Sequence, residues 1–236
     1  MIEVKLDNIS KSYNKGDVNE LNVLTNLTLF VPKSSAVSIE GTNGSGKTTL
    51  LKVIEGSLNP DIGNVYFDEQ NVTNYDEIKR SVYISKVHQN PLLDLAPTLT
   101  LEENLIISLM KNEKVKLRKY STSKRTQYVK NFLEKYDFSF LNNRLLEKVT
   151  TFSGGQKQII SLLSAIISKP QILLLDEPTS NLDHDNTLIF TDIIKKIQIE
   201  FQPTIIIISH HFKEISTITS NHYKIESGQL IQYYHE

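Results

Sequence analysis

A glycine-rich segment, Gly41–Thr48, has the composition and spacing needed to bind phosphate groups. It fits the pattern G-x-x-x-x-G-K-[ST], in which glycines let backbone N–H groups turn toward phosphate oxygens. We expect Lys47 to reach the β- and γ-phosphates of a bound nucleotide and the Thr48 hydroxyl to bind Mg²⁺. A helix that starts here would add the positive end of its dipole. The expected nucleotide contacts are Gly41, Thr42, Asn43, Gly44, Ser45, Gly46, Lys47, Thr48 and Thr49.

Two neighbouring carboxylates follow a short apolar run. Ile172–Leu175 predicts a buried strand, and Asp176 and Glu177 come directly after it. The end of a strand is where an α/β sheet presents groups to a ligand. We therefore expect Asp176 to hold Mg²⁺ and Glu177 to act as the general base toward an attacking water. The alternative is a solvated acidic turn before Pro178.

A third segment reads Ser153, Gly154, Gly155, Gln156 and precedes a predicted helix. Serine is a favoured N-cap, and two glycines would let backbone N–H groups approach an anion closely. An ordinary capped helix start has the same composition. The residues alone therefore leave both interpretations open.

The elements that position these segments alternate along the chain. Strands are predicted by short apolar or alternating runs at Ile2–Ile9, Asn26–Val31, Ala36–Glu40, Asn64–Phe67, Gln171–Leu175 and Thr204–Ile208. Helices are predicted at Lys47–Glu55, Gln156–Ser168 and His184–Phe201, and on the faces formed by Leu101, Leu105 and Leu109 and by Val129, Phe132, Leu133 and Tyr136. Continuous apolar strands that alternate with helices indicate an α/β fold with a parallel sheet.

Composition limits the possible partners. The formal net charge of −1 lacks the basic surplus that a nucleic-acid-binding surface needs, so we expect no nucleic acid partner. The charged run Lys111–Lys130 is interpreted as a solvated helix face. The absence of cysteine excludes disulfides and thiolate metal sites. The apolar runs Ile172–Leu175 and Ile205–Ile208 are far shorter than the roughly 20 residues that span a bilayer, so we expect a partner to do any crossing.

The order of short motifs resembles the nucleotide-binding domains of ABC transporters over nearly the whole chain. The motifs are Gly41–Thr48, Gln89, the Ser-Gly-Gly-Gln signature at 153–156, Asp176 and Glu177, Ser-Asn-Leu-Asp at 180–183, and His210 after Ile205–Ser209. The resemblance implies a P-loop NTPase (RecA-like) core with a parallel sheet, an N-terminal antiparallel β subdomain and an inserted α-helical subdomain. One ABC ATPase domain would span 1–236, with its core at 1–88 and 157–236 and its helical part at 89–156.

The resemblance also implies residue roles. Tyr13 matches the aromatic residue that stacks on adenine. Gln89 matches the residue that senses Mg²⁺ and the attacking water, and His210 matches the residue that contacts the γ-phosphate. Asp183 matches a residue that carries contacts across a dimer interface. His88 and His211 are expected on the surface.

In the family that the chain resembles, the signature serves the ATP of a second copy. Ser153, Gly154, Gly155 and Gln156 would close over the ATP held by a partner cassette, and two Mg-ATP would lie between two domains. A monomer should then bind ATP but hydrolyse it poorly. Phe152 and Ile159 replace the usual leucine and arginine, and neither change is expected to affect ATPase activity.

Likeness to a narrower group suggests a transport role. Ala96–Leu105 and Gly155–Leu163 look like ATPase subunits of bacterial importers of aromatic amino acids or similar small solutes, although Pro178 departs from that group. Such a subunit would lie in the cytoplasm, on the inner face of the membrane, with permease subunits and an extracytoplasmic solute-binding protein as partners. Permease contacts are expected at Leu92, Leu93 and Leu95, or these leucines pack within the helical part.

Other classes of protein share some of these motifs. An ABC exporter ATPase would have the same set, and so would a non-transport ABC ATPase acting in translation or DNA maintenance. The latter usually has two cassettes or a long coiled coil, and this sequence has one P-loop and no heptad run. P-loop kinases and GTPases lack the separate signature that precedes Asp176 and Glu177 here, which argues against both classes.

Overall fold

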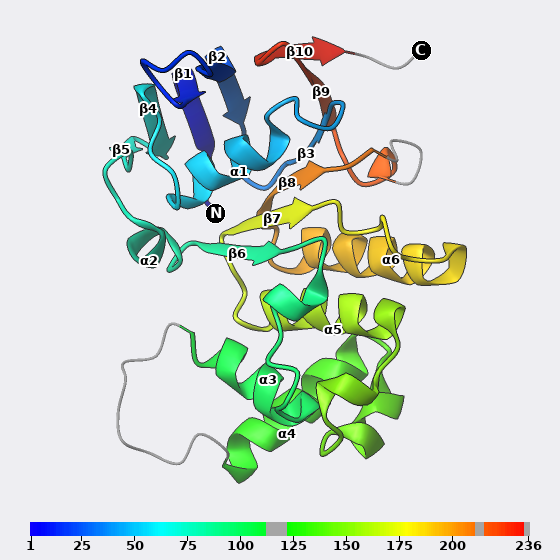
Figure 1. The fold of residues 1–236 in the computed structure, drawn as a ribbon. Helices are drawn as coiled ribbons and strands as arrows, with labels where there is room; N and C mark the ends of the chain where they lie inside the picture. The colour runs from blue at the N-terminus through cyan, green and yellow to red at the C-terminus, as the bar shows by residue number, and fades with distance from the viewer. Residues whose placement is uncertain (112–121, 211–214, 234–236) are drawn as a thin grey trace.

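A six-stranded sheet lies at the centre of the computed structural model, which describes residues 1–111, 122–210 and 215–233 (Figure 1). Its strand order is β10-β9-β3-β8-β7-β6, with all pairs parallel except β9 and β10. The strands are β3 (Ala36–Glu40), β6 (Ile84–Val87), β7 (Ile172–Asp176), β8 (Thr204–Ile208), β9 (Asn221–Glu226) and β10 (Gln229–Tyr233). The predicted parallel sheet is confirmed.

A separate antiparallel sheet forms the N-terminal part, as expected. Its order is β2-β1-β4-β5, with β1 (Val4–Tyr13), β2 (Leu21–Val31), β4 (Ile62–Phe67) and β5 (Gln70–Asn71). The second strand starts five residues before the predicted Asn26, because Leu21 pairs with Tyr13 at the far end of β1. Cross-strand pairing therefore extends a strand whose first residues show little apolar pattern.

The central strands are buried on both faces, which explains their continuous apolar sequences. In β7, Ile172 and Leu174 pack into a core shared with helix α1 (Lys47–Glu55) and the antiparallel sheet. Leu173 and Leu175 point the other way, into a core shared with helices α5 (Gly154–Ile167) and α6 (His184–Glu200). This alternation follows from the two-residue period of a strand.

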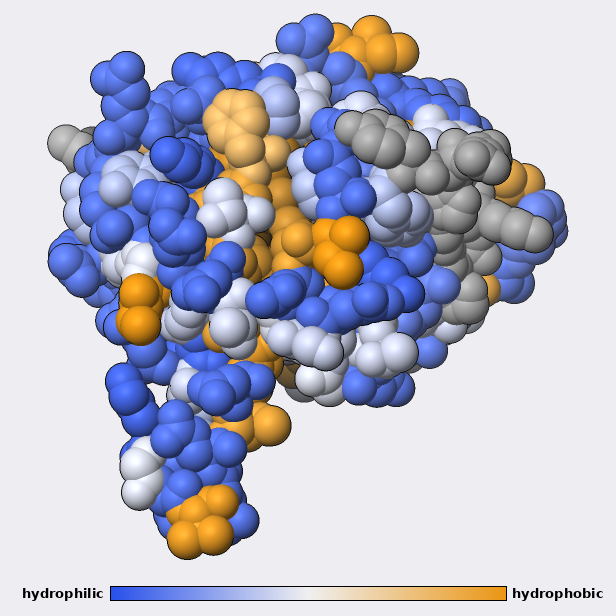
Figure 2. All heavy atoms as spheres, turned by 90° about the horizontal axis from the view of Figure 1, so that it is seen from above, coloured by the Kyte–Doolittle hydropathy of each residue, from blue (hydrophilic) through white to orange (hydrophobic). Residues whose placement is uncertain are grey.

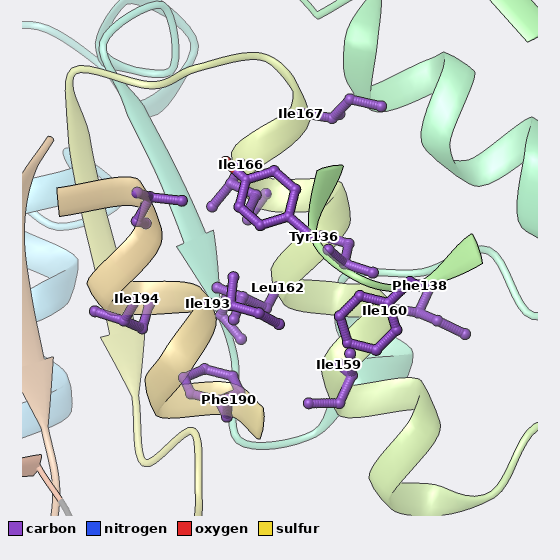
Figure 3. Close-up of a cluster of buried hydrophobic side chains, with 14 of the residues drawn as sticks. Tyr136, Phe138, Ile159, Ile160, Leu162, Ile166, Ile167, Phe190, Ile193 and Ile194 are labelled. Atoms are coloured by element: carbon purple, nitrogen blue, oxygen red, sulfur yellow. The ribbon is translucent and has the colours of Figure 1, made fainter. Parts of the chain in front are cut away.

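A helical lobe lies beyond α5 in Figure 1. It contains α3 (Leu101–Leu109), α4 (Ser123–Lys135) and 3₁₀ turns at Pro91–Leu93, Ser139–Arg144 and Val149–Thr151, while the short helix α2 (Glu77–Arg80) belongs to the other side. Figure 3 shows side chains of the lobe, α5 and α6 in one apolar cluster. The predicted boundary between residues 156 and 157 falls inside α5.

The charged run at Lys111–Lys130 lies only partly within the described residues. Residues 112–121 fall outside them, and in the rest of the run only Val129 is buried. The face drawn in Figure 2 is mainly hydrophilic, with apolar residues in small separate areas and one strip between hydrophilic side chains. Within 1–111, 122–210 and 215–233, no helix combines the length and apolar character of a membrane span.

Arg80 is fully buried and joins α1 to the segment that follows β5. Its guanidinium donates to the carbonyl oxygens of Val53 and Ile54, in the last turn of α1, at 2.7 and 2.9 Å. It also donates to the carbonyls of Thr73 and Tyr75 at 2.9 and 3.0 Å. These bonds satisfy helix-end carbonyls that would otherwise be unpaired. Burial lowers the pKa of Arg80 to about 10, so the side chain is still charged at neutral pH.

We predict that Arg80→Met lowers the free energy of unfolding by about 3 kcal/mol or more, because four carbonyl oxygens, two of them in fully buried hydrogen bonds, lose their donor. Urea-induced unfolding measures this loss. Lys52→Met on the exposed side of α1 removes the same charge and should cost under about 0.5 kcal/mol. Equal losses in the two variants would contradict the structural role of Arg80.

Candidate nucleotide-binding site

The glycine-rich segment forms a loop between β3 and α1. Gly44 and Gly46 have φ angles of 81° and 107°, in the left-handed region that favours glycine. A Cβ atom at Gly46 would lie 2.8 Å from the carbonyl oxygen of Val23, so the loop packs closely on β2. Thr42, Asn43, Gly44 and Gly46 of the loop line an open pocket together with Lys47 and Thr48. A curled glycine-rich backbone beside a lysine suits a phosphate group.

Lys47 is the cation of the loop, and only 6% of its surface is exposed. Its Nζ donates to the carbonyl oxygens of Gly41 and Thr42 at 2.7 and 3.0 Å. Burial lowers the pKa of Lys47, while the nearby carboxylates of Glu177 and Asp176 favour the charged form. A phosphate oxygen would be a stronger partner for this ammonium group than a neutral carbonyl.

The two carboxylates at the end of β7 have different environments. Burial raises the pKa of Asp176, Lys86 lowers it and Glu177 raises it further, so a cation nearby would offset the cost of the ionised form. Glu177 adopts a left-handed φ of 48°, which is uncommon for a residue with a side chain. Its N–H donates to the carbonyl oxygen of Ile208 at 2.8 Å. The backbone thus changes direction where the strand ends.

The Glu177 carboxylate lies between two predicted site residues. Its Oε1 is 2.7 Å from Nε2 of His210, and its Oε2 accepts a hydrogen bond from Nε2 of Gln89 at 3.2 Å. The same amide of Gln89 also donates to the Ser180 hydroxyl at 3.3 Å. Asn181 donates to the carbonyl oxygen of Gln89 at 3.3 Å. Segments predicted separately from the sequence therefore meet at one carboxylate.

These groups surround a pocket of about 810 Å³. It is lined by Tyr13, Leu21, Val23, Thr42, Asn43, Gly44, Gly46, Lys47, Thr48, Thr49, Gln89, Glu177 and His210. The Tyr13 hydroxyl lies 3.4 Å from Oγ1 of Thr49, which places the ring beside the start of α1. Leu21 and Val23 were not predicted from the sequence. Leu21 reaches the pocket because it pairs with Tyr13 across β1 and β2, a pairing that only the folded chain reveals.

Oxygen donors for a hard cation are present beside this pocket. Thr48 and Gln89 line it, and Asp176 ends the adjacent strand. Hydroxyl, amide and carboxylate oxygens are suitable ligands for Mg²⁺, which usually completes its shell with water and substrate phosphates. The described residues contain no group of three or more His, Cys, Asp or Glu residues that could hold a metal by themselves.

The predicted signature residues do not line this pocket. Ser153 caps α5 by accepting from the N–H of Gln156 at 3.3 Å, and the Gln156 side chain accepts from the N–H of Ser153 at 3.1 Å. A Cβ atom at Gly154 would meet nothing within 4 Å, whereas one at Gly155 would lie 2.8 Å from Nδ2 of Asn186. That amide donates to both carboxylate oxygens of Asp183. Asn186, which the sequence did not single out, thus joins the signature to Asp183.

The structure revises the expectations for His88 and Leu95, and a third expectation concerns a residue outside the described range. His88 is half-buried rather than a surface residue, because its Nδ1 lies 2.5 Å from Oδ1 of Asp94. Leu95 is 4% exposed and packs in the core of the helical lobe, so it is not a surface contact. Leu92 and Leu93 are 48% and 69% exposed. His211 lies outside the described residues.

The two departures from the family pattern occupy apolar surroundings. Phe152 is 2% exposed, and the guanidinium carbon of Arg144 lies 4.0 Å from the centre of its ring. Ile159 is 3% exposed in the core between the lobe and α6 (Figure 3). An apolar side chain is therefore the one that fits at residue 159.

Comparisons with known proteins agree with this geometry. The tyrosine transport ATP-binding protein of Clostridioides difficile (strain R20291) is 32% identical over 231 residues, covering 98% of this chain and 90% of that protein. The lipoprotein-releasing system ATP-binding protein LolD of Buchnera aphidicola subsp. Acyrthosiphon pisum (strain APS) is 30% identical, with 98% of each covered. A dimeric post-hydrolysis structure of the ATP-binding cassette MJ0796, bound to ADP and Pi, has a TM-score of 0.82 and 26% identity, covering 99% of this chain and 100% of that one.

The family model described as ABC transporter matches residues 24–180. That range is more than half of the chain, and it includes the phosphate-binding loop, Gln89, the signature and the two carboxylates at the end of β7. The chain therefore belongs to the ABC transporter family, as one of its ATP-hydrolysing, ATP-binding cassettes.

Proposed function

We propose that the protein is the ATPase subunit of a transporter and hydrolyses Mg-ATP between two copies of the cassette. The observation that supports this most directly is the position of Glu177, with His210 and Gln89 on its two carboxylate oxygens and Lys47 nearby. A water held at this carboxylate would have its proton acceptor beside the phosphate-binding loop. That arrangement suits the transfer of a phosphoryl group to water.

In this proposal each residue has a definite role. The N–H groups of Gly41–Thr48, followed by Thr49, bind the phosphates, and Lys47 exchanges two carbonyl oxygens for phosphate oxygens. Tyr13 stacks on the adenine. Glu177 accepts the proton of the attacking water, while His210 and Gln89 orient that carboxylate. Thr48, Gln89 and Asp176 would hold Mg²⁺, which would supply positive charge beside the phosphate oxygens.

The second copy supplies the signature. Ser153, Gly154, Gly155 and Gln156 lie outside the pocket of their own chain, and a Cβ at Gly154 would meet no atom within 4 Å. Exposed N–H groups at the start of α5, with the helix dipole behind them, suit a phosphate from a partner. Asn186 donates a hydrogen bond to the Asp183 carboxylate, so Asp183 lies beside this surface. The dimer of the similar cassette MJ0796 supports the same assembly.

We also propose that the cassette drives import of a small solute, with an amino acid as the first candidate. The likeness to a tyrosine transport ATP-binding protein supports this assignment. The membrane partners are permease subunits, with contacts at the exposed Leu92 and Leu93, and an extracytoplasmic solute-binding protein delivers the solute. The cassette then works in the cytoplasm on the inner face of the membrane. The likeness to a lipoprotein-releasing protein makes an exporter the second candidate.

Glu177→Gln should bind ATP and accumulate as a dimer. The substitution removes the proton acceptor but nearly keeps the shape, so we expect kcat to fall at least about 100-fold. Size-exclusion chromatography with and without Mg-ATP shows the dimer, and a phosphate-release assay gives kcat. Lys47→Ala serves as the control that binds no nucleotide in titration calorimetry. A Glu177→Gln protein that is fully active and monomeric would contradict the role of Glu177.

Gly154→Ala should weaken the ATP-dependent dimer of the Glu177→Gln protein at least about 10-fold, because the added methyl group faces the partner's ATP. The monomer should be unaffected, since alanine favours a helix and meets no neighbouring atom. Analytical ultracentrifugation measures the dimer, and calorimetry measures ATP binding by the monomer. Unchanged dimerisation would rule out closure of the signature over a partner's nucleotide.

Asp176→Asn should raise the melting temperature of the nucleotide-free protein. Burial raises the folded-state pKa of Asp176 above its ordinary value of 3.8, so at neutral pH the ionised side chain destabilises the fold and a neutral amide does not. In this variant, Mg²⁺ together with ATP should raise the melting temperature of the protein no more than ATP alone does. Thermal unfolding with and without Mg-ATP tests both. A lower melting temperature without nucleotide would contradict this account.

A further inference from the structure

Two buried side chains and one half-buried side chain form a polar cluster between β6 and α5. The Asp94 carboxylate is 9% exposed and accepts from the N–H of His88 at 2.9 Å and from the Ser161 hydroxyl at 2.5 Å. Nδ1 of His88 lies 2.5 Å from its other oxygen. We call Asp94, His88 and Ser161 the Asp94 cluster. It links the loop after β6 to the helix that starts with the signature.

A second hydrogen bond runs parallel to this link. Gln158, one turn before Ser161 on α5, donates from Nε2 to the carbonyl oxygen of His88 at 3.1 Å. The residue after His88 is Gln89, whose amide contacts the Glu177 carboxylate. The helix α5 is therefore bonded to the residue that immediately precedes a group of the ATP pocket.

Bonds to a buried carboxylate are well suited to fix one arrangement. Charge-assisted hydrogen bonds are stronger than neutral ones, and a buried carboxylate without its donors is costly. Asp94 therefore favours the one position of the loop that keeps its donors in place. Neither His88, Asp94 nor Ser161 lines the pocket that Gln89, Lys47 and Glu177 share.

We propose that Asp94, with His88 and Ser161, is a positioning residue that holds Gln89 against Glu177. The inference rests on the proposed function of Gln89 and Glu177. The Asp94 cluster acts on the hydrolysis step through Gln89. It leaves the binding of ATP by the P-loop unchanged.

The test compares two serines of α5. Ser161→Ala removes a donor to Asp94, and we expect kcat of ATP hydrolysis to fall about 10-fold with little change in KM or in the Kd of the monomer for ATP. Ser164→Ala is the matched control, because it is also buried on α5 and its hydroxyl has no partner among the described residues. It should keep wild-type kcat. Ser161→Thr keeps the hydroxyl and should recover most of the activity.

A double-mutant cycle separates positioning from a merely structural role. If Asp94 acts through Gln89, Ser161→Ala should lower kcat little further in a Gln89→Ala protein that retains measurable activity. Equal kcat values for Ser161→Ala and Ser164→Ala would overturn the proposal, and so would full additivity with Gln89→Ala. These results leave the proposed function standing if the wild type hydrolyses ATP and Glu177→Gln dimerises. Failure of those two measurements would instead reject the proposed function.

Discussion

The register of three parallel strands decides which side chains can meet at the proposed catalytic pocket. Val87 of β6 pairs with Leu175 of β7, and Asp176 pairs with Ile208 of β8. Gln89 and His210 each follow their strand by two residues, so they emerge on either side of Glu177. A shift of one residue in either pair would turn the alternating side chains to the wrong face. The continuous apolar sequences of these strands thus hold the site together as well as the core.

Several residues around the pocket lack fully favourable partners or conformations within the protein alone. Lys47 donates to two neutral carbonyl oxygens rather than to an anion. Glu177 has an unfavourable backbone conformation, and burial raises the pKa of Asp176. Each of these features costs stability, and a bound nucleotide with its cation would offset several of them. The arrangement favours binding over stability at this one place.

Sequence patterns indicated the residues that share the candidate pocket better than they indicated the residues that support it. The spacing of Gly41–Thr48 and the apolar run before Asp176 depend on local chemistry, so the P-loop and the strand end could be read directly. Arg80 and Asp94 could not, because their partners lie up to 67 residues away and the pairing requires the folded chain. Leu95 looked like its neighbours Leu92 and Leu93, yet the 3₁₀ turn before it directs only Leu95 inward. The local sequence pattern shows that these residues are apolar, whereas tertiary packing decides which of their side chains are exposed.

In the proposed dimer each α5 helix would face two sites. Its first turn would contact the partner's ATP, and its second and third turns bond through Gln158 and Ser161 to the loop that carries Gln89 of its own chain. Closure over one nucleotide would then bias the position of Gln89 at the other. Energetic coupling of this kind is reciprocal, so the two sites would affect each other equally. A short polar connection between adjacent elements would be sufficient for this, because Gln158 and Ser161 lie on the same helix as the signature.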